Sequence, residues 1–139
     1  MMRSDTARLE DRLGELEPEY KSRGEAQVGR LLDRYGLPFF YEQPTLIRDR
    51  GRHRIWHPDF TLPEHSGMVI EYAGMPDVPD YAAGIAHKRD VYRRNGIAAL
   101  FVYPSHLSGP RWPQRLIERV FRTSERQPPG YRKGGGYRG

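Results

Sequence analysis

Two acidic residues, Asp59 and Glu71, stand where a carboxylate can do chemistry. Asp59 follows a proline in the stretch HPDF, and Glu71 lies in the apolar run MVIEYA, where burying an unpaired acid is costly. Their spacing of twelve positions fits a hairpin that sets the two carboxylates side by side. Adjacent carboxylates repel each other, which raises their pKa values. A divalent cation relieves this repulsion, and Mg²⁺ is typically bound by one or two carboxylates plus water and phosphate oxygens.

Such a metal ion, Mg²⁺ or Mn²⁺, polarises a phosphodiester, helps to generate hydroxide and stabilises the leaving oxygen. Glu25, on an expected helix, is placed either to give a third oxygen ligand or to position a metal-bound water. Lys88 is the candidate for pairing with the scissile phosphate or orienting the attacking water. Tyr81, Lys88 and Tyr92 are separated by seven and four positions, so they share one face of a helix. We therefore expect this face to bring Lys88 to the metal site.

The elements that must position these residues follow from apolar periodicity and from helix-capping signals. Ser22 is the expected N-cap of the first helix, with Glu25 three positions on, and Gly36 is its stop. Asp80 and Gly96 are the corresponding signals of the second helix. The expected helices cover 22–36, 79–96 and 108–125, and the expected strands cover 38–47, 54–62, 67–73 and 97–104.

The order helix, three strands, helix, strand, helix predicts an α/β fold, with a mixed sheet flanked by helices. A helix between the third and fourth strands suits a right-handed crossover to a parallel neighbour. The apolar residues expected to face the sheet are Val28, Leu31, Leu32 and Tyr35 in the first helix, and Trp112, Leu116, Ile117, Val120 and Phe121 in the last. Residues 1–21 are expected to form a charged helical arm, 22–126 the domain, and 127–139 a disordered basic Gly/Arg tail.

The motifs HPDF and VIEYAG, with the downstream Y…HKRDVY, resemble the PD-(D/E)xK nuclease superfamily. They are most similar to small domains related to Holliday-junction resolvases, very-short-patch-repair enzymes and restriction endonucleases, whose lysine has moved to the following helix. The resemblance covers roughly residues 22–104. It implies a single-domain restriction-endonuclease-like αβββαβ core, dependence on a divalent metal, and hydrolysis of DNA in repair, restriction or a mobile element.

By this resemblance, Glu25 matches the helix glutamate, Asp59 the aspartate of Pro-Asp, and Glu71 the second acid. All three are then metal ligands, and together with Lys88 they form the catalytic set. Ala73 stands where the superfamily usually has its lysine, and Lys88 is our inferred substitute.

Net charge is +5 and the sequence pI is about 9.7, which favours a polyanionic partner such as DNA. Basic residues in several segments are candidates for sequence-independent, salt-sensitive contacts with phosphates. They are Arg48, Arg50, Arg52, Arg54, His57, Arg89, Arg93, Arg94, Arg132 and Lys133. The alternative for each is a solubilising surface.

Three functions remain open from the sequence: a metal-dependent endodeoxyribonuclease, an inactive nucleic-acid-binding module, and an interaction protein with structural acids. Ala73 favours the second. Each of these residues also has an interpretation without a function in catalysis. Among the acids, Glu25 would cap its helix, Asp59 would lie in a turn, Glu42 would be a surface acid, and Glu71 would form a salt bridge to a residue such as Arg54. Lys88 would be a solvated lysine, and His57 and His87 would be hydrogen-bonded histidines.

The chain has no cysteine, no secretory signal and no apolar run of roughly 18 residues, and its mean hydropathy is −0.82. These features predict a cytoplasmic protein that does not enter a membrane. Whether it forms a homodimer is left open by the sequence.

Overall fold

Helix α2 (Arg23–Arg34) is set by the cap predicted for it, in a computed structural model that describes residues 17–126. The Ser22 hydroxyl accepts a hydrogen bond from the backbone N–H of Glu25 at 3.1 Å, which satisfies one free donor of the first turn. Beyond the helix, Gly36 adopts a φ of 68°, the left-handed conformation that favours glycine. Tyr35 was expected to face the sheet, but it is exposed, because as the C-cap residue it lies where the chain leaves the helix.

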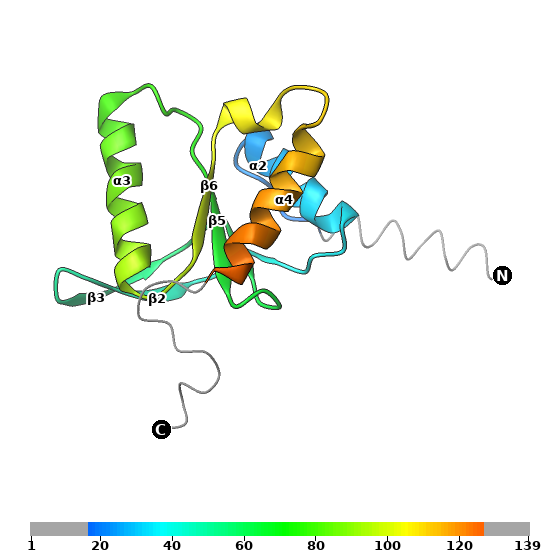
Figure 1. The fold of residues 1–139 in the computed structure, drawn as a ribbon. Coiled ribbons are helices and arrows are strands. Elements are labelled where there is room, and N and C mark those ends of the chain that lie inside the picture. Colours follow the sequence, from blue (N-terminus) through cyan, green and yellow to red (C-terminus); the bar gives the residue numbers. More distant parts are fainter. Residues whose placement is uncertain (1–16, 127–139) are drawn as a thin grey trace.

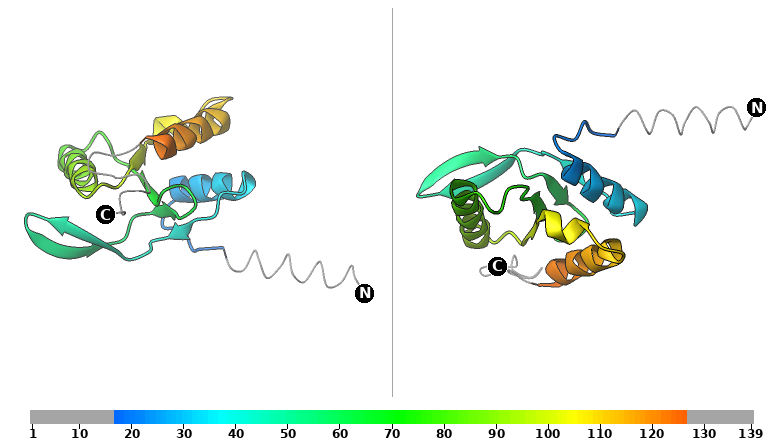
Figure 2. Two further views of the ribbon diagram at one scale, coloured as in Figure 1. Left: turned by 60° about the horizontal axis from the view of Figure 1, so that its bottom comes forward. Right: turned by 90° about the horizontal axis from the view of Figure 1, so that it is seen from above.

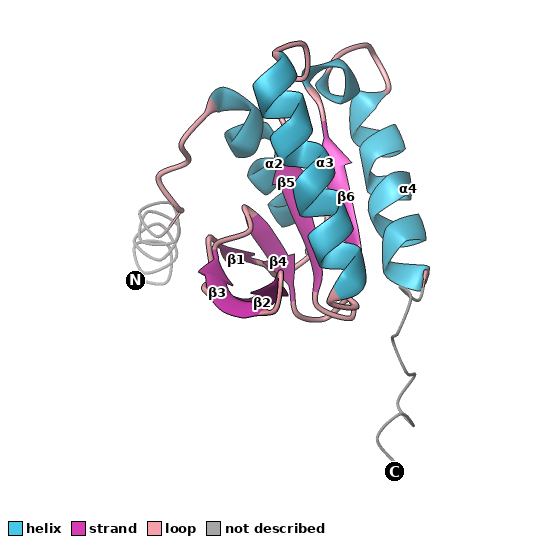
Figure 3. Ribbon diagram, turned by 90° about the vertical axis from the view of Figure 1, so that its left-hand side faces the viewer, coloured by secondary structure: helices cyan, strands magenta, loops and turns pink. Residues whose placement is uncertain are grey.

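A four-stranded mixed sheet forms the centre of the fold, in the spatial order β1-β4-β5-β6. Its strands are β1 (Phe40–Tyr41), β4 (Phe60–Leu62), β5 (Met68–Tyr72) and β6 (Ala99–Val102). The first three strands are antiparallel to their neighbours, and β6 is parallel to β5. Helix α3 (Pro79–Arg94) makes the crossover between β5 and β6, as predicted (Figure 3).

Two of the predicted strands are each divided, because the chain turns at the non-repetitive segments 42–44 and 57–59. Glu42 has a φ of 55°, which no extended strand accommodates, and Pro44 cannot donate to a ladder. The released halves, β2 (Thr45–Asp49) and β3 (Arg52–Trp56), pair only with each other as a separate antiparallel hairpin. Figure 2 shows this hairpin extending away from the body of the protein.

The turn of the hairpin is shorter than the gap over residues 48–53 between the two predicted strands. It consists of Arg50 and Gly51, with φ values of 55° and 75°. Positive φ at both central residues is the geometry of a two-residue type I′ turn, which matches the twist of the strands it joins. Arg48 and Arg52 therefore lie on the strands.

Apolar side chains fill both faces of the sheet. Helices α2 and α4 (Trp112–Glu125) cover one face (Figure 1), where the buried residues include Val28, Leu31, Leu32, Phe60, Ile70, Leu116, Ile117 and Val120. Helix α3 and the hairpin cover the other, where they are Ile47, Val69, Ala73, Ile85, Val91, Tyr92 and Phe101. Phe121 was expected to be buried, but it is exposed and lies edge-on to His65.

The N-terminus of α3 differs from the prediction. Val78 is its N-cap residue and makes no side-chain bond, while Pro79 fills the first turn, where its missing N–H costs nothing. Asp80, the predicted cap, lies within the first turn, where a negative charge favours the helix dipole. A short 3₁₀ helix, η1 (Pro104–Leu107), joins β6 to α4.

Tyr20 packs against the ring of Phe60 and closely approaches Gly29, so the ordered body begins before Ser22. The predicted arm over 1–16 and the tail over 127–139 lie outside the described residues. Between residues 17 and 126, the helices are all too short or too polar to traverse a lipid bilayer.

Candidate active site

Asp59 and Glu71 are neighbours across the β4–β5 hairpin. The register pairs Phe60 with Ile70, so the next positions outward are Asp59 and Glu71. The backbone N–H of Tyr72 donates to Asp59 Oδ2 at 2.7 Å, which fixes one oxygen of that carboxylate. Glu71 is only 4 % exposed. The predicted juxtaposition of the two acids is therefore confirmed.

Helix α3 turns one face toward this acidic pair. The Tyr92 hydroxyl donates a hydrogen bond to Glu71 Oε2, and Lys88 Nζ lies 3.7 Å from Glu71 Oε1. Near the start of the helix, the Tyr81 hydroxyl accepts a hydrogen bond from the N–H of Gly74 at 3.0 Å. All three residues of the predicted helix face thus contact β5 or the residues just after it.

Ala73 lies two positions after Glu71, so both side chains project from the same side of the strand. Ala73 is fully buried in the apolar cluster between the sheet and α3. A lysine at that position would bury its ammonium among apolar side chains, whereas α3 brings the Lys88 ammonium to within 3.7 Å of Glu71. The plain alternative for Glu71, a salt bridge, is therefore also met, although its partner is Lys88 and not Arg54.

Glu25 is a buried acid of α2. Its backbone N–H bonds the Ser22 hydroxyl, while its carboxylate accepts a hydrogen bond from the hydroxyl of Tyr41. The cap therefore uses the backbone of Glu25 and leaves its carboxylate to face the sheet. The start of α2 approaches β5 closely, since a Cβ on Gly24 would lie 2.1 Å from the ring of Tyr72.

The electrostatics of the site centre on Asp59. Burial, then the nearby charge of Glu71 and that of Glu25, raise the pKa of Asp59 to about 7. The Tyr72 N–H and the Lys88 ammonium act in the opposite direction but are weaker. Without a metal ion, Asp59 is therefore partly protonated near neutral pH.

The donor set fits a hard dication bound by a pair of carboxylates. Asp59 and Glu71 each have one oxygen held by a hydrogen-bond donor. The second oxygen of Glu71 lies 3.7 Å from Lys88 Nζ, so a metal ion bound there would share it with the lysine. In the part of the chain that the structure describes, however, no group of three or more Asp, Glu or His side chains could hold a metal ion as placed. Direct ligation by Glu25 as well is therefore not found, and a contact through water is the role that remains for it.

Lys21 and Glu42 lie at the edge of this site and were not predicted to pair. Lys21 Nζ is 2.6 Å from Glu42 Oε2, and the Glu42 N–H donates to the carbonyl of Asp59 at 3.0 Å. Glu42 raises the pKa of Lys21, with smaller contributions from Glu25 and Asp59. The sequence Glu-Gln-Pro at 42–44 could have predicted that the strand ends before Glu42 and that this side chain leaves the sheet.

A second buried acid, Asp49, was missed. His87 Nε2 lies 2.9 Å from Asp49 Oδ2, and the ring of His87 meets Trp56 edge-on. The hydrogen bond from His87 holds the pKa of Asp49 below its usual range. Alternation along β2 would have placed Asp49 on the same side as buried Ile47. For His87, the hydrogen-bonded interpretation is confirmed.

The predicted phosphate contacts are spread over the surface. Arg48, Arg50, Arg52 and Arg54 are exposed on the hairpin, as is His57 just beyond it. Arg93 and Arg94 are exposed, but both pair with Asp90. Arg89 is exposed and donates to the Tyr103 hydroxyl. Arg132 and Lys133 lie outside the described residues.

The described chain is thus a mixed α/β protein with an acidic pair, a lysine and two tyrosine hydroxyls gathered near the end of β5. Comparison of the chain with protein-family models, with curated proteins and with solved structures found no match.

Proposed function

We propose that this chain is a Mg²⁺-dependent DNA endonuclease of the PD-(D/E)xK type, with Mn²⁺ as a substitute metal. One observation carries the proposal: the ammonium of Lys88 lies 3.7 Å from Glu71, beside an aspartate whose pKa is raised to about 7. A carboxylate pair with an adjacent lysine is the set of groups that metal-assisted phosphodiester hydrolysis needs. Repair, restriction or a mobile element is the proposed context.

The order of elements supports this assignment of fold type. With the β2–β3 hairpin set aside as an insertion, the chain runs α2, β1, β4, β5, α3, β6, which is an αβββαβ order. In this arrangement Glu25 is on the first helix, Asp59 precedes the second strand of the sheet, and Glu71 is on the third. Glu25 and Glu71 therefore occupy their expected elements, whereas Asp59 lies just before the strand on which it was expected.

Asp59 and Glu71 would hold the metal ion, and Glu25 would reach it through a water molecule. When bound, the ion would polarise the scissile phosphodiester and supply a hydroxide at neutral pH. The hydroxyl of Tyr92 and the N–H of Tyr72 are positioning groups, because each fixes one oxygen of a ligand carboxylate.

Lys88 has two roles available to its ammonium. It is 44 % exposed, so its Nζ faces both Glu71 and the solvent through which a substrate arrives. From there it can donate to a non-bridging phosphate oxygen or orient the attacking water. The exposed arginines of the β2–β3 hairpin would contact the sugar–phosphate backbone and give salt-sensitive, sequence-independent binding.

A second candidate is a nucleic-acid-binding module of the same fold without catalysis. The buried Ala73 favours it, because the lysine position usual for the superfamily is lost here. This candidate predicts DNA affinity that does not depend on Asp59 or on a divalent cation.

The test is a cleavage assay on plasmid and linear DNA with Mg²⁺, with Mn²⁺ and with a chelator, run beside a DNA-binding assay. Cleavage by the native protein that requires the metal and disappears in Asp59→Ala supports the nuclease. Binding without metal-dependent cleavage selects the second candidate, and the absence of both binding and cleavage at low salt contradicts both.

A further inference from the structure

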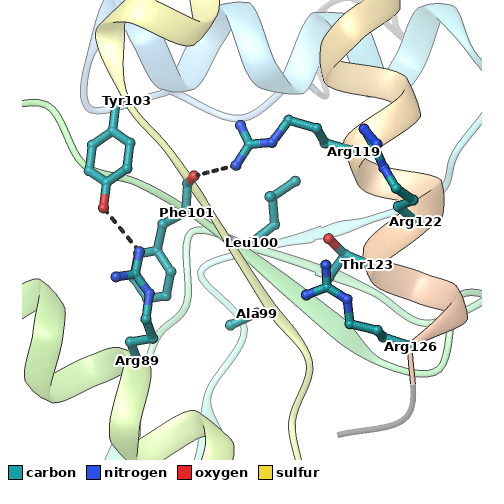
Figure 4. Close-up of a pocket in the computed structure, with 9 residues that line it drawn as sticks. All are labelled: Arg89, Ala99, Leu100, Phe101, Tyr103, Arg119, Arg122, Thr123 and Arg126. Carbon is teal, nitrogen blue, oxygen red and sulfur yellow. Dashed lines mark hydrogen bonds between the residues drawn. The ribbon is translucent and has the colours of Figure 1, made fainter.

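A pocket of about 460 Å³ lies between α3 and α4, along the free edge of β6. Two arginines of α4, the residue that follows this helix, Arg126, and one arginine of α3 line it, as Figure 4 shows. The lining consists of Arg89, Arg119, Arg122 and Arg126, together with Ala99, Leu100, Phe101, Tyr103 and Thr123. Four cations and no acid therefore surround this space.

The partners that the structure gives these arginines are neutral. Arg119 donates through Nη2 to the carbonyl of Phe101 at 3.4 Å, while its Nη1 is buried without a hydrogen-bond partner. Arg89 donates to the Tyr103 hydroxyl at 3.0 Å, and its guanidinium lies 4.6 Å from the centre of the Phe101 ring. A buried guanidinium nitrogen with no acceptor costs free energy, and the neutral partners leave the positive charges of Arg119 and Arg89 uncompensated.

Among the described residues, no carboxylate neutralises these arginines. Across residues 17–126, none of the ion pairs involves any of the four arginines. Residues 127–139, which follow Arg126, contain no aspartate or glutamate. Burial and the adjacent charge of Arg122 lower the pKa of Arg119, which is the mark of a cation that lacks a counter-charge.

We propose that this pocket binds a phosphate monoester. Guanidinium groups match phosphate oxygens in bidentate geometry, and a phosphate monoester carries about −1.5 to −2 charges at pH 7 with three acceptor oxygens. A carboxylate carries a single charge, which is too little for four guanidiniums. The hydroxyls of Tyr103 and Thr123 add neutral partners, and the volume exceeds that of phosphate alone, which leaves room for an attached nucleoside.

The pocket is separate from the acidic site but adjoins it. Phe101, in its wall, pairs across the parallel strands with Glu71, and Arg89 follows Lys88 on α3. The ligand has two sources with the same chemistry: a free mononucleotide, or the phosphorylated 5′ end of a nucleic-acid strand. The proposal stands whether or not the acidic site cleaves DNA.

The test is calorimetric titration of the full chain at pH 7.5 with a chelator present, so that the acidic site binds no metal. The probes are inorganic phosphate, a nucleoside 5′-monophosphate, and one short oligonucleotide with either a 5′-phosphate or a 5′-hydroxyl. The variants are Arg119→Gln/Arg122→Gln and, with only exposed positions changed, Arg122→Gln/Arg126→Gln. The matched control is Arg111→Gln/Arg115→Gln, which removes the same charge from exposed positions of α4 outside the pocket.

We expect both pocket variants to weaken binding of the phosphorylated probes at least about tenfold, and the control to change it less than about twofold. Preference for the 5′-phosphate oligonucleotide over the mononucleotide identifies a strand end as the source, whereas equal binding of the two identifies a free nucleotide. The proposal is overturned if the Arg122→Gln/Arg126→Gln variant and the control lose the same amount of binding affinity. It is also overturned if the native chain does not prefer phosphorylated probes over hydroxyl probes.

Discussion

Asp49 and Asp59 are two acids on the side of the sheet that α3 covers, and their surroundings shift the two pKa values in opposite directions. Asp49 has a hydrogen-bond partner, His87, at 2.9 Å, and this bond lowers the pKa of Asp49. Asp59 has a second carboxylate beside it, and burial with that neighbour raises its pKa to about 7. The same residue type thus has a lowered pKa in one place and a raised pKa in the other, although Asp49 Oδ1 is buried without a hydrogen-bond partner.

This contrast separates a structural acid from one that awaits a partner. An acid paired within the chain contributes to stability, and its loss should affect folding before anything else. An acid that repels its neighbour costs stability, and such a cost points to function. The following predictions sharpen or break this distinction.

The largest expected effect is on DNA cleavage. Asp59→Asn should reduce metal-dependent cleavage by on the order of 10³-fold, because an amide cannot replace a charged ligand. Asp49→Asn should keep the cleavage rate within about twofold, since Asp49 bonds only His87. Single-turnover cleavage rates would measure both, and equal losses in the two variants would erase the distinction between the acids.

The second effect is on stability as a function of pH in the absence of metal. The folded-state pKa of Asp59, about 7, lies above its unfolded value of roughly 3.9, so the stability it gives is full below the unfolded value and is lost as pH rises through 7. The free energy of unfolding should fall by on the order of 3 kcal/mol from pH 4 to pH 8. Denaturant unfolding at several pH values would measure this slope, and Asp59→Asn should flatten it.

Asp49 should show the opposite dependence. Because its folded-state pKa is lowered, its contribution is present above the unfolded value and is lost as pH falls through the folded one. Asp49→Asn should therefore change the pH dependence of the free energy of unfolding only at acidic pH. A change on the alkaline side would show that Asp49 is not neutralised by His87.

The third effect concerns the two lysines near the acids. Lys88→Ala should lower the cleavage rate by about 10²-fold while metal binding is retained, because the ammonium acts on the phosphate or on water. Lys21→Ala is the matched control, since Lys21 is exposed and paired with Glu42, and it should cost less than about fivefold. Cleavage kinetics beside metal titration would separate the two, and equal losses would argue for a general electrostatic role.

The smallest effect is the thermal stability of Asp49→Asn. Removing a charged hydrogen-bond partner of His87 should lower Tm by about 3 to 6 °C near neutral pH. Asp59→Asn should leave Tm unchanged or raise it, because an amide does not repel Glu71. Thermal unfolding followed by circular dichroism measures both shifts, which should differ in sign.

The sequence predicted much of the fold, because the strongest local signals agree with the tertiary structure. The Ser22 cap, the stops at Gly36 and Gly96 and the crossover helix are all present where expected. The two divided strands were not predicted, since Glu42 and Pro58 interrupt runs that otherwise read as continuous strands. Which half then joins the sheet depends on contacts distant in sequence, which propensity cannot give.

The candidate site was predicted in part for the same reason. The spacing of twelve positions across a hairpin predicted that Asp59 lies beside Glu71. The helical spacing of Lys88 from Tyr81 and Tyr92 predicted that Lys88 lies close to these acids. The bond between Asp49 and His87 and the arginine pocket could not be predicted, because each joins elements whose relative placement only the fold determines.

The most direct test of the account is a calorimetric titration of Mn²⁺ or Mg²⁺ into the purified chain at pH 7.5, with a short DNA duplex present. The account predicts saturable uptake of metal that is lost in Asp59→Asn and retained in Asp49→Asn. Absence of uptake by the native chain at millimolar metal, or equal uptake by Asp59→Asn, would contradict it.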